Sequence, residues 1–326
     1  MKKDYIMNTK IEVLLCQGTQ NKFVLVSELE NSLNISEKMR HILSYNLCHK
    51  EAFDTNGILY IQKSDDEACV GKMRMFNTDG SEAEMCGNGI RCVGRFIAEY
   101  TGKDDFIIET KLGKVKIRHM ENIYKDIPTY SALINPVNLN CSSLPMIAES
   151  KTFTNSSIDG LLESEDTFTA MSVQNPHIVF IRDEIDRDEL LSFGDIINSR
   201  LDIFPNQVNI NFVKILDNNS IYVLTNERGS GITPSCGTGM SSSAYVSCLL
   251  GHMSFSQPTN VYNDGGKVIC IADEKEGTIQ LIGNATYIEK SDVVFDGKCD
   301  LASIDLIHTY IEERIEYTEF MKECLL

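Results

Sequence analysis

The sequence predicts an α+β protein of two domains, and three observations lead to this class. The chain has 326 residues, about twice the usual length of one domain. Short strand patterns and a few helical patterns are mixed without regular βαβ alternation, which disfavours a doubly wound parallel sheet. A cysteine-led glycine motif begins at Cys86 and again at Cys236, an offset of 150 residues. The offset is close to half the chain, so each half is expected to contain the same element.

Strand signals are short and stand next to Gly, Asn or Asp. They cover residues 23–26, 58–61, 73–76 and 106–108. Alternation over residues 208–212, followed by the turn 217–220 and an apolar run, predicts a hairpin. Two further hairpin turns are expected at 265–266 and 275–277.

Helical periodicity is confined to a few segments. Ile90, Val93, Gly94 and Ile97 share one helical face, and residues 186–198 form a second helical segment. The tail through Ile304, Ile307, Ile311 and Ile315 has the spacing of an amphipathic helix with an acidic opposite face. We expect that apolar face to dock onto a domain, or to support a homodimer.

Charge and cysteine usage restrict the class of protein. The net charge of −17 opposes binding to nucleic acid or anionic lipid and favours a small-molecule partner. No run approaches the roughly 20 apolar residues of a membrane helix, and no export signal is apparent. The eleven cysteines include no C-x-x-C pair, so free thiols and a cytoplasmic location are predicted.

The two glycine motifs place chemistry at predicted helix starts. Each cysteine leads into Gly-x-Gly and a helix-compatible run, at Cys86 and at Cys236. Unpaired amides and the positive helix end favour a thiolate and bind a carboxylate. Two such helix ends facing each other would put one sulfur on each face of an α-carbon. That arrangement suits inversion by an acid and a base. Cys92 and Cys248, inside the two helical runs, are interpreted as small core residues.

The surrounding sequence resembles the diaminopimelate epimerase family. The similarity includes "FNTDGSEAEMCGNG", "ERGSGITPSCGTG", "QNKFVLV", "MSVQNPHIVF", "FPNQVNINFV", "YNDGG" and "LIGNATYI", in the family's order. It implies two similar domains, each with strands wrapped around a central helix and the active site in the cleft between them. The domains are expected at 1–130, joined by 288–326, and at 131–287. The implied reaction interconverts LL- and meso-diaminopimelate in lysine and peptidoglycan synthesis, without a cofactor or metal.

The resemblance also assigns residues. It implies a catalytic pair, Cys86 and Cys236. The backbone cradle for the reacting carboxylate matches Gly87, Asn88, Gly237 and Thr238. The substrate ligands match Asn21, Asn77, Asn175, Asn209, Glu227 and Arg228, with His177 in support. An arginine can bind a planar carboxylate through two hydrogen bonds, which suits Arg228 to the distant end of the substrate.

The chain departs from the family at two places. Gln17 stands where the family has histidine, and Lys22 follows Asn21. The segment "CHKEAFDTNG" from Cys48 to Gly57 has lost most of the glycines of a loop that helps to close the family's site. We therefore expect altered substrate selectivity rather than loss of activity, and transfer no ligand from this loop.

Two other interpretations also fit the sequence. A cofactor-independent racemase of another amino acid, of the proline-racemase type, would also use paired cysteines. It would not need Glu227 and Arg228 to hold a second amino-acid head group. A non-catalytic amino-acid binder or thiol sensor on the same scaffold would bind without exchanging the α-proton.

Overall fold

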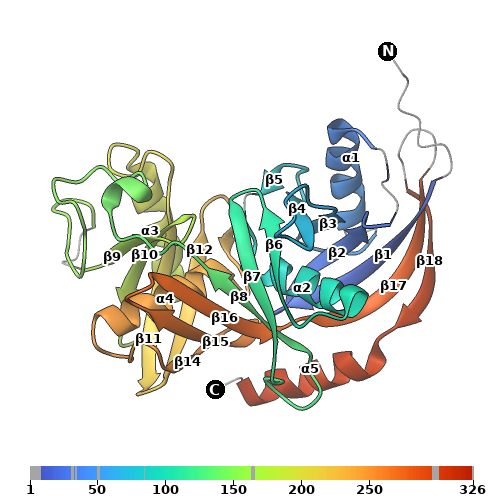
Figure 1. Cartoon of the computed structure of the whole chain (residues 1–326). Coiled ribbons are helices and arrows are strands. Elements are labelled where there is room, and N and C mark those ends of the chain that lie inside the picture. The colour runs from blue at the N-terminus through green and yellow to red at the C-terminus, as the bar shows by residue number, and fades with distance from the viewer. Residues whose placement is uncertain are drawn as a thin grey trace. The chain divides into compact units, whose positions relative to one another are not determined.

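Two compact units make up the chain in the computed structural model (Figure 1), which describes residues 9–30, 33, 35–49, 52–83, 85–162, 166–295 and 301–324. The first unit takes residues up to Ala132 together with Gly283–Glu323, and the second takes Leu133–Ile282 with the end of the chain from Cys324. Each unit is a mixed α+β structure, as the sequence predicts. Among the described residues, no helix combines the length and the apolar character needed to span a membrane.

In its described residues, the first unit contains three helices and most of the strands. The helices are α1 (Glu37–Cys48), α2 (Gly87–Thr101) and α5 (Ile311–Cys324). The strands are β1 (Thr9–Gly18), β2 (Asn21–Ser27), β3 (Gly57–Gln62), β4 (Gly71–Asn77), β5 (Glu82–Ala83), β6 (Asp105–Thr110), β7 (Gly113–Met120), β8 (Thr129–Ile134), β17 (Thr286–Phe295) and β18 (Leu301–Thr309).

The described part of the second unit contains two α-helices and a short 3₁₀ turn at Cys141–Ser143. The helices are α3 (Arg187–Ser199) and α4 (Gly237–Leu249). The strands are β9 (Thr169–Ser172), β10 (Pro176–Ile181), β11 (Asn209–Asp217), β12 (Ser220–Glu227), β13 (Gly231–Ile232), β14 (Pro258–Asn263), β15 (Gly266–Asp273) and β16 (Thr278–Asn284).

The strand order repeats between the units. In the first, β1, β2, β3, β4, β6, β7 and β8 pair in that order, with parallel steps at β2–β3 and β4–β6. In the second, β9, β10, β11, β12, β14, β15 and β16 pair in that order, with parallel steps at the same two places. A parallel step needs a crossover, and helices α1 and α3 supply the first of these in each unit. Helices α2 and α4 supply the second. The half-chain repeat predicted from the motifs is thus an architectural repeat.

Helices α2 and α4 are the central helices of their units. Helix α2 contacts β1, β2, β3, β4 and β7, and α4 contacts β9, β10, β11, β12, β14 and β15. The predicted apolar face of α2 is fully buried at Ile90, Val93 and Ile97. Helix α4 is buried on all sides, down to its serines, two of which donate to backbone carbonyls one turn earlier. Such burial is typical of a helix surrounded by other elements.

Local chemistry explains where most elements begin and end. The side chain of Asp186 accepts from the amides of Asp188 and Glu189 and so caps α3 at the predicted start. The hairpin β11–β12 turns at Asp217–Ser220, where the carboxylate of Asp217 accepts from the Asn219 amide. The turns expected at 265–266 and 275–277 join β14 to β15 and β15 to β16.

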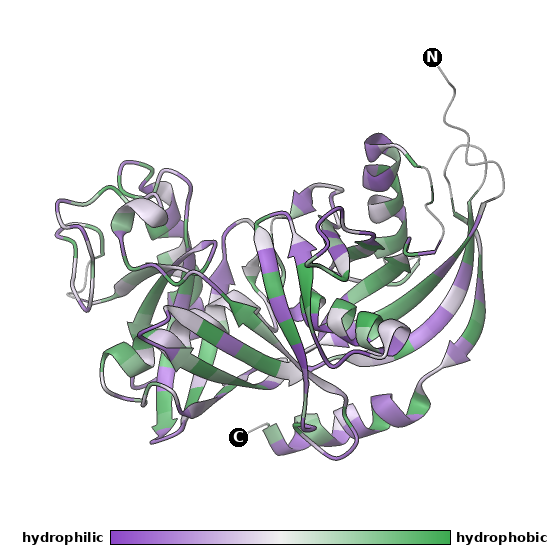
Figure 2. Ribbon diagram, viewed as in Figure 1, coloured by the Kyte–Doolittle hydropathy of each residue, from purple (hydrophilic) through white to green (hydrophobic). Residues whose placement is uncertain are grey.

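The tail does not form the predicted helix. Residues 301–309 form strand β18, which pairs antiparallel with β17, and the helix begins only at Ile311. Side chains of the expected apolar face stay exposed, at 49% for Ile307, 60% for Ile311 and 54% for Ile315. Hydrophilic and hydrophobic residues alternate along α5 (Figure 2). The helix instead buries the rings of Tyr317 and Phe320.

An ion pair fastens α5 to α2. The guanidinium of Arg95 donates to both carboxylate oxygens of Glu313, at 2.6 and 2.8 Å. The same guanidinium lies 3.6 Å from the ring centre of Tyr287, whose backbone amide also donates to Glu313. Because the Arg95 and Glu313 side chains are only 8% and 18% exposed, this contact is shielded from solvent. The first turn of α5 is therefore held to the helix that follows Cys86.

Candidate active site

Both predicted cysteines lie at helix starts, as the motifs predict. Cys86 is the N-cap of α2 and its sulfur accepts from the Gly89 amide at 3.2 Å. Cys236 is the N-cap of α4 and accepts from the Gly239 amide at 3.4 Å. Cys86 is half-buried and Cys236 is buried, and none of the described cysteines forms a disulfide. Cys92 and Cys248 are buried inside the helices, which agrees with a packing role.

In the first unit, a buried arginine joins the start of α2 to the β1–β2 turn. Arg91 donates to the Gly87 carbonyl (3.0 Å) and to the side-chain oxygen of Asn88 (3.1 Å). It also donates to the Thr19 hydroxyl (2.8 Å) and to the Asn284 carbonyl (3.2 Å). The turn thereby lies against the expected carboxylate cradle.

The β1–β2 turn approaches α2 so closely that it needs glycine. A β-carbon on Gly18 would lie 2.9 Å from the Asn88 carbonyl oxygen and 3.0 Å from Nη2 of Arg91. The turn leads directly into Asn21, the first residue of β2. The side-chain oxygen of Asn21 is buried and has no hydrogen-bond partner among the residues that the structure describes. A buried acceptor without a donor is costly in a folded protein, and a bound ligand with an N–H group would satisfy it.

The other predicted residues of this unit have local roles or differ from the family. Asn77 ends β4, and its side chain donates to the Ser81 hydroxyl at 3.0 Å, so it also holds a turn. Gln17 is buried and accepts from the Gln20 amide, whereas Lys22 is exposed. In the altered segment 48–57, residues 50 and 51 lie outside the described part, and Gly57 begins β3.

In the second unit, the predicted residues form one connected group beside Cys236. The Thr238 hydroxyl lies 3.5 Å from the Cys236 sulfur. The amide nitrogen of Asn175 donates to the same hydroxyl at 3.1 Å, and the Asn175 oxygen lies 3.1 Å from Nε2 of His177. Asn209 is the neighbour of His177 across the parallel β10–β11 pair. Residues predicted from separate segments of the sequence therefore lie in one hydrogen-bonded group.

Glu227 and Arg228 lie at the end of β12, close to that group. The Arg228 amide donates to the Asn209 side chain at 3.0 Å, and its guanidinium donates to the Asn206 carbonyl at 2.9 Å. The carboxylate of Glu227 accepts from the Thr233 hydroxyl at 2.5 Å. Arg228 is half-buried, so its guanidinium is accessible from solvent.

Burial controls the protonation of this group. It raises the pKa of the Cys236 thiol well above its ordinary value, and the negative charge of Glu227 adds to the rise. The hydrogen bonds from Thr238 and the Gly239 amide act in the opposite direction. Cys236 is therefore a thiol near neutral pH in this state, although its helix-start position alone favours a thiolate. Burial and the nearby Arg228 lower the pKa of His177 to about 3, so its imidazole is neutral.

Sequence reasoning missed three buried polar residues, of which Arg91 and Asn211 contact predicted residues and Thr225 contacts Asn211. Arg91 falls inside an apolar helical stretch, where nothing in the pattern marks it. Asn211 and Thr225 lie on the hairpin β11–β12, and the Asn211 amide contacts both His177 and Thr225. The available signal for Asn211 was its position two residues after Asn209, which puts both side chains on one face of the strand.

Two solved structures share the fold. A probable proline racemase from Agrobacterium radiobacter superposes with a TM-score of 0.62 at 12% identity, covering 86% of this chain and 92% of that one. A hydroxyproline epimerase from Agrobacterium vitis gives 0.61 at 12% identity, covering 89% and 95%. The repeated strand order and the two cysteine-capped central helices thus define the class as the two-unit α+β fold of these proteins.

Sequence comparison identifies the family. The sequence profile of diaminopimelate epimerase matches residues 13–126 and 169–288. The diaminopimelate epimerase of Clostridium acetobutylicum is 39% identical over 318 residues, covering 96% of this chain and 94% of that protein. The enzyme of Listeria innocua is 38% identical over 315 residues, with 94% of each chain covered. The chain belongs to the diaminopimelate epimerase family.

Proposed function

We propose that this protein is a diaminopimelate epimerase, which interconverts the LL and meso forms by proton transfer at one α-carbon, in lysine and peptidoglycan precursor synthesis. The observation that carries the proposal is the occurrence of Cys86 and Cys236 as N-caps of equivalent central helices, in a chain of this family. Inversion needs a base on one face of the carbon and an acid on the other. The mechanism therefore requires the two helix starts to approach opposite faces of the bound substrate.

The helix starts supply the carboxylate cradle. Amides in the first turn of a helix have no carbonyl partner within that helix. In α2 and α4, the third amide of the turn donates to the cysteine sulfur. We assign the amides of Gly87, Asn88, Gly237 and Thr238 to binding of the carboxylate next to the reacting carbon.

The two sulfurs begin in different states in the proposed mechanism. Because burial raises the pKa of Cys236, this residue is a thiol and delivers a proton. Cys86 then acts as the thiolate that removes the α-proton from the opposite face. The carbanion is reprotonated by Cys236, and the product leaves with the protonation states of the sulfurs exchanged. The reverse reaction starts from that exchanged state.

The distant amino-acid head group has its own ligands. Arg228 is assigned to the far carboxylate, and the unsatisfied oxygen of Asn21 to a substrate ammonium. Asn77, Asn175, Asn209 and Glu227 complete the proposed binding set, with His177 in support. A one-headed amino acid leaves these groups unpaired, so proline and alanine should be poor substrates.

The test follows α-deuteration in D₂O by NMR, with LL-diaminopimelate, proline and histidine supplied separately. We expect exchange with diaminopimelate only, and loss of at least about a hundredfold in turnover for Cys86→Ala and Cys236→Ala. The buried cysteines inside the same helices give matched controls, Cys92→Ala and Cys248→Ala, which should keep turnover. Binding without α-deuteration would indicate a non-catalytic binder, and faster exchange with proline would indicate a proline-racemase type of enzyme.

A second substitution tests the assignment at the far end of the substrate. Arg228→Lys keeps the positive charge but loses the planar pair of donors, so KM for diaminopimelate should rise at least about tenfold. A KM unchanged by this substitution would contradict the role of Arg228.

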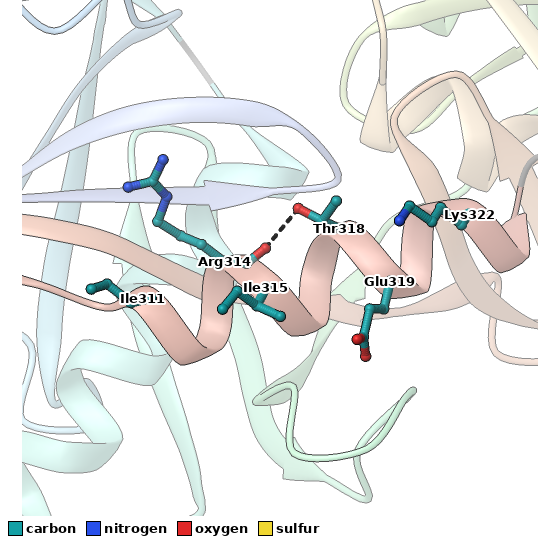
Figure 3. A pocket seen from close by; sticks show the side chains of 6 residues that line it. All are labelled: Ile311, Arg314, Ile315, Thr318, Glu319 and Lys322. Atoms are coloured by element: carbon teal, nitrogen blue, oxygen red, sulfur yellow. Dashed lines mark hydrogen bonds between the residues drawn. The ribbon is translucent and has the colours of Figure 1, made fainter.

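We also propose that the protein is cytoplasmic and forms a homodimer. The absence of disulfides among the described cysteines supports a reducing compartment. For the homodimer, the support is a set of exposed apolar side chains on β18 and α5, namely Leu306, Ile307, Ile311 and Ile315. Ile311 and Ile315 line a surface hollow along α5 (Figure 3), and a second copy would bring an identical apolar face. The double substitution Ile311→Glu and Ile315→Glu should yield a monomer by light scattering, and an unchanged mass would reject this surface.

A further inference from the structure

A chain of buried side chains runs from the hairpin β11–β12 to the sulfur of Cys236, entirely within the second unit. It begins at Thr225, whose hydroxyl donates to the side-chain oxygen of Asn211 at 2.9 Å. The amide nitrogen of Asn211 donates to the backbone carbonyl of Ile178 at 2.9 Å. Both ends of the Asn211 amide are therefore fixed, with the oxygen accepting and the nitrogen donating.

The orientation of Asn211 determines the tautomer of His177. Its amide nitrogen also lies 3.2 Å from Nδ1 of His177. Since that nitrogen is a donor, Nδ1 is the acceptor, and the single proton of the neutral imidazole is on Nε2. Nε2 then donates to the Asn175 side-chain oxygen at 3.1 Å. The Asn209 amide nitrogen, 3.4 Å from the same Nε2, is a van der Waals neighbour in this tautomer.

The same donor-to-acceptor order of hydrogen bonds continues to the sulfur of Cys236. With its oxygen accepting from His177, Asn175 presents its amide nitrogen to the Thr238 hydroxyl, at 3.1 Å. The Thr238 oxygen thus accepts from Asn175, and its own hydrogen is directed to the Cys236 sulfur, 3.5 Å away. No proton leaves its donor along this chain. Its effect is to make the last group a donor to sulfur, which stabilises a thiolate there.

We propose that Asn211 and Thr225 are positioning residues that set the direction of this chain and thereby make Thr238 a hydrogen-bond donor to Cys236. The inference rests on the proposed role of Cys236 in proton transfer. Asn211 and His177 are fully buried and Thr225 is 4% exposed, so water does not compete for these bonds. The charged groups nearest to the chain are Glu227 beside Cys236 and Arg228 beside His177.

The glycine motif provides independent support. A β-carbon on Gly239 would lie 2.5 Å from the Thr225 hydroxyl oxygen and 2.6 Å from the Asn211 side-chain oxygen. Glycine is therefore required because the Thr225–Asn211 pair packs directly beneath the first turn of α4. In the first unit, a β-carbon on the equivalent Gly89 would lie 2.9 Å from a methyl group of Leu59. The first turn of α4, after Cys236, thus packs on polar side chains, whereas the first turn of α2, after Cys86, packs on an apolar side chain.

The first measurement is the tautomer of His177, by ¹⁵N NMR of the imidazole in the full-length wild-type protein. The inference requires a neutral ring with the proton on Nε2. A proton on Nδ1 would reverse every donor in the chain and would overturn the proposal.

The second measurement is the rate of alkylation of Cys236 by iodoacetamide, quantified by peptide mapping across pH. The alkylation of Cys86 in the same sample is the internal reference. Thr225→Val removes the first donor with almost no change in shape, and Thr225→Ser retains it. We expect Thr225→Val to slow Cys236 alkylation near neutral pH about tenfold, to shift its pH profile upward and to lower kcat more than it changes KM. Thr225→Ser should behave as the wild type.

Two further variants strengthen the comparison. Asn211→Leu should have the same effect as Thr225→Val on Cys236 alkylation, and Thr238→Val should reproduce it by removing the last donor. Equal alkylation of Cys236 in Thr225→Val and Thr225→Ser would overturn the positioning role, even if Asn211→Leu failed to fold. Alkylation and NMR need no turnover, so loss of the proposed epimerase activity in the wild type would be recognised separately.

Discussion

Replacement of Arg91 by methionine tests how the start of α2 is held. The guanidinium is fully buried and donates to four oxygens, on Gly87, Asn88, Thr19 and Asn284, at 2.8 to 3.2 Å. Hydrogen bonds from a charged donor contribute roughly 1.5 to 3 kcal/mol each, but bonds of one side chain are not additive. Methionine has a similar length and recovers part of the apolar packing. We therefore expect Arg91→Met to lower the free energy of unfolding by about 3 to 5 kcal/mol.

The assay is urea unfolding followed by circular dichroism, with an exposed arginine as the matched control. Arg118 pairs with Asp105 at 2.8 Å, but their side chains are 50% and 43% exposed. An exposed pair contributes about 0 to 1 kcal/mol, so Arg118→Met should shift the urea midpoint little. Equal midpoints for Arg91→Met and Arg118→Met would refute the argument that the buried guanidinium holds the start of α2, where the carboxylate cradle is proposed.

Three further predictions concern stability. Because burial and Arg228 lower the pKa of His177 to about 3, the unfolded chain binds a proton that the folded chain does not. The free energy of unfolding should then fall by up to about 1.4 kcal/mol per pH unit from pH about 6.5 down to about 3, and His177→Gln should flatten that part of the urea-midpoint profile. Gly239→Ala should lower the stability by roughly 1 to 3 kcal/mol in thermal unfolding, because its β-carbon would lie 2.5 Å from a hydroxyl oxygen; an unchanged midpoint would argue against the close approach. Glu313→Gln removes the negative charge that faces the buried guanidinium of Arg95, so amide hydrogen exchange in α5 should become faster. Exchange equal to the wild type would show that the ion pair does not fasten this helix.

The sequence predicted those parts of the fold that local chemistry determines. The hairpin at Asp217–Ser220 and the helix start at Asp186 depend on residues within a few positions of each other, and both form as expected. The cysteine-led motifs predicted two helix starts for the same reason. The helix predicted for the tail was wrong over residues 301–309. The spacing of Ile304, Ile307 and Ile311 fits a helix, but the residues up to 309 form a strand because they pair with β17. Pairing between distant segments overrides local periodicity.

Prediction of the site had a similar limit. Asn175, His177 and Thr238 were predicted from short motifs, but nothing local indicated that they would be hydrogen-bonded to one another. Arg91 was missed because a buried arginine within an apolar helical face looks like a surface residue in sequence. Its partners Thr19 and Asn284 are far apart along the chain, so only the folded structure brings them together.

The side chains beneath the first turns of the two central helices differ in polarity. The two repeats should therefore differ in their tolerance to mutation. Beneath α2, Gly89 faces the aliphatic Leu59, and such contacts accept exchanges among apolar residues of similar volume. Beneath α4, Thr225 and Asn211 need both a particular shape and a particular arrangement of donors and acceptors. If the repeats arose from one ancestral half, the half with Cys86 can change through single substitutions among apolar residues. The half with Cys236 would have to change several polar residues together, so its buried strands should diverge more slowly.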